Sequence, residues 1–152
     1  MDKILFLLFF LVNLHSHSNE KIEINADQFT YDKENTRIYA TGNVEIIDQE
    51  FKLYANKVFV NNESKVLSAR ENIKIFNADG SILKADKIVA DNTLENALIE
   101  NNHIYIPRIY KDKNIFLRLA AKKLERRDKD WEQLQYGTFT ACELCYNEKT
   151  KK

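Results

Sequence analysis

Apolar and polar residues alternate along most of the chain after position 21, which is the pattern of strands in a half-buried sheet. Ile22, Ile24 and Ala26 share one face, and Ile38 and Ala40 continue that face after a polar turn. The alternation predicts an all-β domain of about eight antiparallel strands. The expected strands cover residues 22–31, 37–47, 51–60, 65–76, 82–90, 97–106, 115–125 and 131–141.

A repeat of about 30 residues organises these strands. Each copy carries an alanine between apolar residues at a fixed spacing, namely Ala26, Ala55, Ala85 and Ala121. Segments rich in Asn and Asp recur with the same period, so each copy is expected to form two strands joined by a turn.

The expected strand at residues 115–125 has a second interpretation. Ile115, Leu119 and Leu124, with Lys and Arg between them, also fit an amphipathic helix. Because Leu119 and Leu124 fall in the fourth copy of the repeat, we favour the strand.

The apolar face changes side after each repeated alanine. Leu53 and Ala55 have one parity, whereas Val58 and Val60 have the other. Since a strand exchanges its faces only where an extra residue is inserted, we expect a β-bulge or corner at the two polar positions that follow the alanine. Strands bent at recurring bulges form a sandwich or an open, twisted jelly roll.

The inward positions of such a roll are the candidate binding residues. They form either a filled core or an apolar trough that holds acyl chains, and both arrangements need the same residues. The candidates are Ile24, Phe29, Tyr31, Ile38, Val44, Ile46, Leu53, Val58, Ile73, Ile75, Leu83, Ile88, Ile99 and Ile104.

Residues 1–18 have the pattern of a secretory signal peptide. Lys3 precedes an apolar run from Ile4 to Leu14, and Ser16 and Ser18 are small residues near the expected cleavage point. The run is shorter than the roughly 20 residues of a membrane-spanning helix, so an uncleaved anchor is the weaker interpretation. Export would place the chain in an oxidising compartment.

Charge and composition narrow the function. The 23 basic and 23 acidic residues balance, which argues against a nucleic-acid partner. The sequence contains no nucleophile elbow, phosphate loop or zinc-protease helix, so we expect neither an enzyme nor a cofactor. His103 is the sole histidine after the leader, and with Cys142 and Cys145 it falls short of a four-ligand zinc site, so no metal is expected.

The stretch from Ala26 to Ile46 resembles the signature of the OstA-like domain found in the lipopolysaccharide-transport proteins LptA, LptC and the N-terminal part of LptD. The matching residues are Ala26, Asp27, Tyr31, Asp32, Ala40, Gly42, Asn43 and Val44, and the similarity extends over the chain after the leader. The resemblance implies an open jelly roll whose interior holds the acyl chains of lipid A. It also implies terminal strands that dock edge to edge with neighbouring jelly rolls by β-augmentation.

The segment from Phe139 to Cys145 resembles the one that follows this domain in LptD, whose cysteines form disulfides with an outer-membrane barrel. The similarity favours an LptD-type chain and structural disulfides for Cys142 and Cys145. A local Cys142–Cys145 disulfide remains open, whereas a thioredoxin-like site lacks its βαβ context. Residues 142–152 are expected to link residues 19–141 to a barrel that this sequence does not contain, so the chain is either a fragment or a free-standing domain.

The resemblance predicts a periplasmic lipid-binding module of lipopolysaccharide transport, associated with the outer membrane. Expected partners are lipopolysaccharide, other Lpt jelly rolls and, in a full-length LptD, the barrel and its lipoprotein plug. The alternative is a closed-core structural or protein-docking β-domain without lipid binding.

Overall fold

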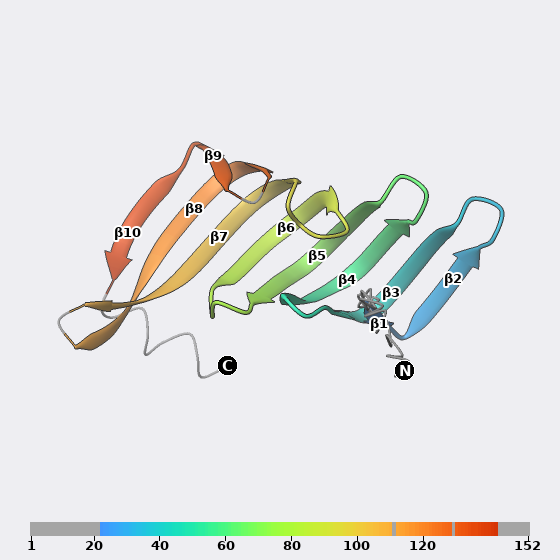
Figure 1. Ribbon diagram of the computed structural model, residues 1–152, viewed down its shortest axis with the longest axis horizontal. Helices are drawn as coiled ribbons and strands as arrows, with labels where there is room; N and C mark the ends of the chain where they lie inside the picture. The colour runs from blue at the N-terminus through green and yellow to red at the C-terminus, as the bar shows by residue number, and fades with distance from the viewer. Residues whose placement is uncertain (1–21, 111, 129, 143–152) are drawn as a thin grey trace, which may run out of the picture.

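The computed structural model describes residues 22–110, 112–128 and 130–142, which form one open antiparallel sheet (Figure 1). Its order is β1-β3-β4-β5-β6-β7-β8-β10, with β2 beside β3 and β9 beside β8. No helix is found within these ranges, and therefore none that could cross a membrane. The strands are β1 (Glu23–Asn25), β2 (Gln28–Asp32), β3 (Arg37–Ile47), β4 (Phe51–Asn61), β5 (Val66–Asn77), β6 (Ile82–Asp91), β7 (Ala97–Tyr110), β8 (Lys113–Arg127), β9 (Trp131–Gln135) and β10 (Thr138–Cys142).

Both sheet edges depart from the predicted eight strands. Segment 22–31 forms β1 and β2, and segment 131–141 forms β9 and β10, so the sheet has ten strands. The first segment breaks at Asp27, and the second breaks at Tyr136, whose backbone has a φ of 53°. An inner strand is hydrogen-bonded on both sides, so it continues through a corner as one bent strand. An edge strand is hydrogen-bonded on one side alone, so the same corner divides it into two strands. Segment 115–125 lies within β8, which confirms the strand and excludes the helix.

Of the bulges or corners predicted from the parity change, the one after Ala55 is confirmed, and two further interruptions lie in β3 and β5, where none was predicted. Pairing is interrupted between Thr41 and Val44 in β3, and again between Tyr54 and Lys57 in β4, the stretch that contains Ala55. A third interruption, in β5, lies between Arg70 and Ile73. These interruptions are side by side on neighbouring strands, so they form a continuous line across the sheet. We call this the bulge line.

The bulge line divides the sheet into two layers that face each other. Layer A contains β2, β9 and the intervening strand halves that pair with them, and layer B contains β1, β10 and the other halves. Residues of both layers surround the same cavities: Ile38 of layer A and Ile46 of layer B share one, and Leu94 and Leu83 share another. The space between the layers is the trough.

Two inward rows of cross-strand neighbours form most of the trough wall. The inner members of each row are buried. In the layer A row these run across the sheet from Ala40 of β3 to Leu124 of β8, and in the layer B row from Ile46 of β3 to Ile104 of β7. Each row is a chain of directly opposed residues on successive strands. The layer A row is Phe29, Ala40, Val58, Ala69, Ile88, Ile99, Leu124 and Leu134; the layer B row is Ile24, Ile46, Leu53, Ile75, Leu83, Ile104, Leu119 and Phe139.

Paired polar side chains hold the corners at the bulge line. Asp27 accepts a hydrogen bond from the side-chain amide of Asn43 at 3.0 Å, and its backbone N–H donates to the carbonyl of Gly42 at 2.9 Å. The third copy of the repeat forms the same contact, in which the side-chain amide of Asn101 donates a hydrogen bond to Asp86 at 2.9 Å. The repeated Ala-Asp element, together with an asparagine on the neighbouring strand, therefore forms these corners.

Asp and Asn side chains close the turns of layer A. The carboxylate of Asp32 accepts hydrogen bonds from the backbone and side chain of Asn35, and the amide oxygen of Asn61 accepts from the backbone of Ser64. Asp91 has the same role one repeat later, since it accepts from the backbone and side chain of Asn96. Such side-chain caps mimic backbone turns and fix the hairpin geometry.

Asp91 should make stability depend on acid pH. Burial raises the pKa of its carboxyl group, but hydrogen bonds from Asn96, Thr93 and Glu95 outweigh this effect, so the pKa is lowered in the folded chain. A lowered pKa gives stability that is present above the unfolded value of about 3.9 and lost as the pH falls through the folded pKa. In urea unfolding at pH 7, we expect Asp91→Asn to be less stable than the parent by about 1 kcal/mol, a value reduced by partial exposure to solvent.

The difference between Asp91→Asn and the parent should shrink towards pH 3. Asp130→Asn is the matched control, because its carboxylate makes no hydrogen bond within the described ranges. A difference that persists undiminished at pH 3, or an equal loss in the control, would contradict the role of the charged Asp91 cap.

Aromatic residues occupy part of the outer face of the sheet, the face opposite the trough. Tyr39 and Phe59 lie on neighbouring strands with ring centroids 5.0 Å apart, and Tyr54 and Phe76 form an edge-to-face pair at 5.8 Å. The outer face therefore carries apolar ring surface beside its polar residues. Strand-forming aromatic residues pack against cross-strand neighbours even where they remain exposed.

Candidate functional site

The N-terminal half of the trough contains an apolar cavity of about 250 Å³. Ile24 and Ile46 line it from layer B, and Ile38, Val60 and Leu67 line it from layer A. Asn61, Asn62, Lys65 and Asn92, which belong to or adjoin the turns, form its polar margin. The cavity thus has an aliphatic interior and a hydrated rim, the usual composition of a site for an apolar ligand.

A second cavity of about 490 Å³ lies towards the C-terminal half. Phe51, Leu83, Ile104 and Ile106 supply apolar walls, and the buried side chain of Leu94 enters from the β6–β7 loop. Its volume is within the range of ligand pockets in proteins. This cavity also has a charged part, formed by Glu50, Asp79, Arg108, Arg126 and Glu132.

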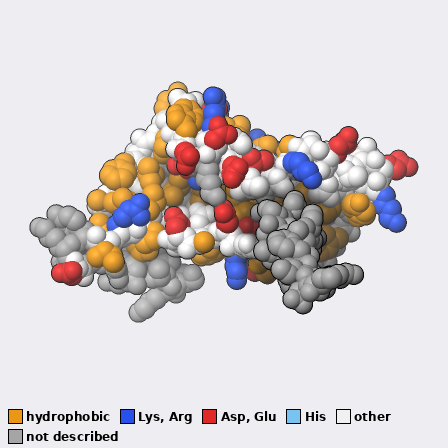
Figure 2. Space-filling view, in the orientation of Figure 1, with side chains coloured by type: hydrophobic (Ala, Val, Ile, Leu, Met, Phe, Trp, Pro, Cys, Tyr) orange, Lys and Arg blue, Asp and Glu red, His pale blue; other side chains and the backbone are white. Residues whose placement is uncertain are grey.

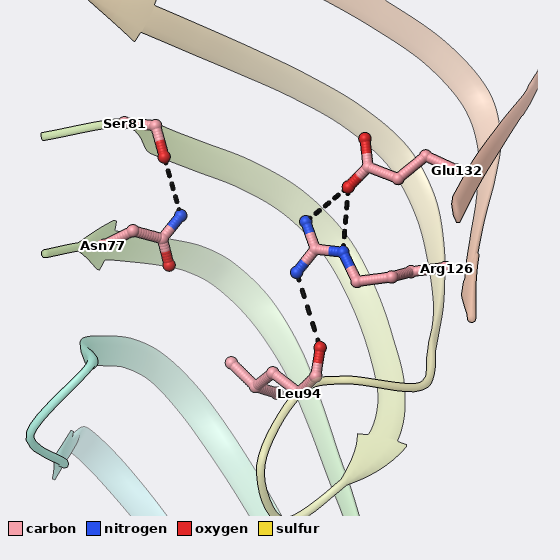
Figure 3. A network of polar contacts seen from close by, with 5 residues as sticks. All are labelled: Asn77, Ser81, Leu94, Arg126 and Glu132. Atoms are coloured by element: carbon pink, nitrogen blue, oxygen red, sulfur yellow. Dashed lines mark hydrogen bonds and ion pairs between the residues drawn. The ribbon is translucent and has the colours of Figure 1, made fainter. Parts of the chain in front are cut away.

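An ion pair lies inside this second cavity (Figure 3). Arg126 donates hydrogen bonds to Oε1 of Glu132 from Nε at 2.8 Å and from Nη2 at 2.6 Å, and from Nη1 to the Leu94 carbonyl at 3.4 Å. Nearby, the Asn77 amide donates to the Ser81 hydroxyl at 2.8 Å. Arg126 therefore ties the β6–β7 loop to layer A and makes this part of the trough polar.

Ten of the fourteen predicted trough residues belong to one buried cluster. Ile24 and Ile38 are half-buried and line the N-terminal cavity. These placements concern packing alone, and they leave the predicted lipid contact a prediction. The ten clustered residues are Val44, Ile46, Leu53, Val58, Ile73, Ile75, Leu83, Ile88, Ile99 and Ile104.

Phe29 and Tyr31 are the exceptions, since they are 51% and 55% exposed. Both have the predicted orientation, because they lie opposite the inward residues Ala40 and Ile38 of β3. They lie on edge strand β2, which has β3 as its single neighbour in the described chain, so little protein covers them. Their exposure therefore follows from the small number of neighbouring strands, and their contact with lipid stays a prediction.

Sequence reasoning missed several trough residues. Val60 and Ile106 follow Val58 and Ile104 by two positions, so the alternation alone would have found them. Arg126 follows Leu124 in the same way, but a charged residue reads as solvent-facing. Leu94 lies in a turn segment with a φ of 60°, where no periodic signal exists.

The two ends of the sheet present unpaired strand edges in the described chain. β1 and β2 pair with β3 alone, and β9 and β10 pair with β8 alone. Phe139, 64% exposed, lies at the C-terminal end of an inward row, just as Phe29 lies at the N-terminal end. Figure 2 shows hydrophobic side chains gathered over β8 and β10. Open edges bearing apolar side chains are sites where another strand can add.

The described ranges contain no group of three or more His, Cys, Asp or Glu side chains that could hold a metal ion. Cys142 is the last residue of β10, but its side chain and all of Cys145 lie outside the described part. The predicted disulfides and the predicted leader, residues 1–18, are likewise outside it.

Comparison with known proteins agrees with this architecture. The family model described as LptA/(LptD N-terminal domain) LPS transport protein matches residues 23–152. Among solved structures, that of LptH from Pseudomonas aeruginosa, titled the LptA homologous periplasmic component of the conserved lipopolysaccharide transport device, matches with a TM-score of 0.57 and 12% identity. The match covers 81% of this chain and 94% of LptH, and at this identity it shows the fold. A search of curated proteins gave no match.

Proposed function

Because this chain belongs to the family formed by LptA and the N-terminal domain of LptD, we propose that it is a lipid-binding module of lipopolysaccharide transport. In this role the trough shields the acyl chains of lipid A from water. Each buried methylene contributes about 0.8 kcal/mol, so an aqueous passage of several acyl chains requires a continuous apolar surface.

The observation that carries the proposal is the continuity of the inward rows. The layer B row contains aliphatic or aromatic residues from Ile24 at one edge of the sheet to Phe139 at the other. Two cavities lie between the layers along this path. A filled core needs neither an exposed aromatic residue at one end of each row nor internal cavities, whereas a lipid path uses both.

Photo-crosslinking in cells tests the lipid contact. A benzophenone amino acid at Ile38, which lines the N-terminal cavity, or at Ile106, which lines the second cavity, should give adducts with lipopolysaccharide. Ile47 and Ile109 are matched controls, because each lies on the same strand as its partner and faces outward. Controls should give adducts at least about tenfold weaker, since water rather than lipid surrounds them.

The same experiment separates the two functions considered for this chain. Adducts from the inward positions alone support lipid transport. Adducts from neither position, in a variant that remains folded by circular dichroism, would support the closed structural or docking domain instead.

The open edges are proposed to dock neighbouring jelly-roll domains of the same transport system. Strand addition satisfies edge backbone groups and joins the inward rows of two domains into one apolar path. Phe29 and Phe139 lie where such a junction would form.

Charged substitutions at the edges test this docking. Phe29→Glu or Phe139→Glu should weaken association with a purified LptA-type partner by about tenfold or more, because exposed aromatic residues often anchor interfaces. Tyr39→Glu is the control, an exposed aromatic residue on the outer face of β3. Sedimentation velocity measures the association; equal binding by all three variants would contradict edge docking.

A periplasmic location and removal of residues 1–18 are part of the proposal. Fractionation followed by N-terminal sequencing should find a mature chain that begins near Asn19. An LptD-type continuation into an outer-membrane barrel, with its lipoprotein plug, predicts that Cys142 and Cys145 are oxidised. Thiol labelling of both cysteines without prior reduction would contradict that assignment.

A further inference from the structure

Four outward side chains form a row across the middle of the sheet, on the face opposite the trough. Tyr54 of β4 lies opposite Lys74 of β5, Lys74 lies opposite Lys84 of β6, and Lys84 lies opposite His103 of β7. These residues border a surface depression of about 750 Å³ beside the bulge line. We call them the outer row.

Within the part of the chain that the structure describes, the two lysines of the outer row form no ion pair. Lys74 and Lys84 are directly opposed like charges, an arrangement that destabilises a sheet. In the described ranges neither ammonium group has a carboxylate within 4.0 Å, although Lys84 lies 5.8 Å from the ring centroid of Tyr105. Arg118 adds a third cation, with Nη2 at 3.1 Å from Nδ1 of His103.

The carboxylates of the depression already have neutral partners. Glu45 accepts a hydrogen bond from the Tyr54 hydroxyl at 2.8 Å, and Asp86 accepts one from the Asn101 amide at 2.9 Å. Neither carboxylate therefore forms an ion pair with Lys74 or Lys84, and the position between these two ammonium groups is where an anion would bind. An anion there would relieve the repulsion and accept charge-assisted hydrogen bonds.

The remaining lining groups suit a hydroxylated ligand. Asn56 and Asn72 border the depression, and their side-chain amides make no hydrogen bond within the described part of the chain. Each amide offers two donors and an acceptor, which match sugar hydroxyl groups. Tyr54 and Phe76, 37% and 41% exposed, supply apolar ring surface at the same place.

We propose that the outer row and its depression bind a phosphorylated saccharide. The phosphate lies between Lys74 and Lys84, the hydroxyl groups contact Asn56 and Asn72, and a sugar face packs against the Tyr54–Phe76 pair. The proposed contacts need no acyl chain, so this proposal is tested independently of the lipid proposal.

Titration of the isotope-labelled full chain followed by NMR tests the site. Glucose 6-phosphate should give saturable backbone shifts confined to the strand segments that carry Tyr54, Lys74, Lys84 and His103. Glucose and inorganic phosphate, titrated separately, should each bind at least about tenfold more weakly, because each makes part of the contacts. Inorganic phosphate that binds as tightly as glucose 6-phosphate, or the absence of saturable shifts, would overturn the proposal.

Charge removal provides the matched variants. The double variant Lys74→Gln with Lys84→Gln should weaken glucose 6-phosphate binding about tenfold or more. It should remain folded, and its urea midpoint at low salt should be equal to or above that of the parent, since a like-charge pair is removed. Lys33→Gln with Lys122→Gln carries the same charge change at exposed positions outside the depression. Equal weakening in this control would assign the effect to net charge and overturn the site.

Discussion

Replacing Ile88 by alanine is expected to lower the free energy of unfolding by about 2–5 kcal/mol, a large fraction of the stability of a domain of this size. Ile88 is fully buried at the centre of the layer A row, between Ala69 and Ile99 on the neighbouring strands. The substitution removes buried methylenes and leaves a cavity that neighbouring strands cannot close without breaking their pairing. Urea unfolding followed by circular dichroism measures the loss.

Ile82→Ala is the matched control, because Ile82 lies on the same strand and faces outward between Phe76 and Tyr105. Its loss should be about 1 kcal/mol or less, as for most partly exposed positions. Equal losses for the two variants would contradict the assignment of inner and outer faces on which the trough depends.

The second large effect is expected from Gly42→Ala at the corner of β3. Gly42 has a φ of +76°, and a Cβ atom there would lie 2.4 Å from Oδ2 of Asp27. The substitution adds left-handed backbone strain and displaces a carboxylate that holds Asn43. Together these effects should lower the free energy of unfolding by about 2–4 kcal/mol in the same urea assay.

Gly80→Ala separates the collision from the backbone strain. Gly80 has a φ of +79°, but a Cβ atom there meets Pro107 Cγ at 3.4 Å, an ordinary contact. Its loss should be near 1 kcal/mol, from strain alone. In the Asp27→Ala background, Gly42→Ala should also become milder, because the carboxylate is gone. A Gly42 loss no greater than the Gly80 loss would show that the Asp27 contact does not hold the corner.

The alternation of residues predicted much of this architecture because strand periodicity is local. Each inward residue of the predicted set faces inward in the sheet, including Phe29 and Tyr31, and the parity change at Ala55 placed a bulge where the pairing is interrupted. The repeat also assigned β8 correctly, although its own residues fitted a helix. Consecutive side chains of a strand point to opposite faces, so the orientation of each residue follows from its neighbours in the sequence and not from distant segments.

The tertiary structure decided the burial and the polar contacts of these residues, which the alternation along a strand does not determine. Phe29 is exposed because its strand is at an edge, and Ile88, with the same orientation, is buried because strands lie on both sides. Arg126 faces the trough because Glu132 and the Leu94 carbonyl, from other segments, satisfy its charge and hydrogen bonds there. The sequence by itself therefore determined which way each side chain points, whereas burial, cavities and ion pairs depend on segments brought together by folding, whose contacts no local pattern records.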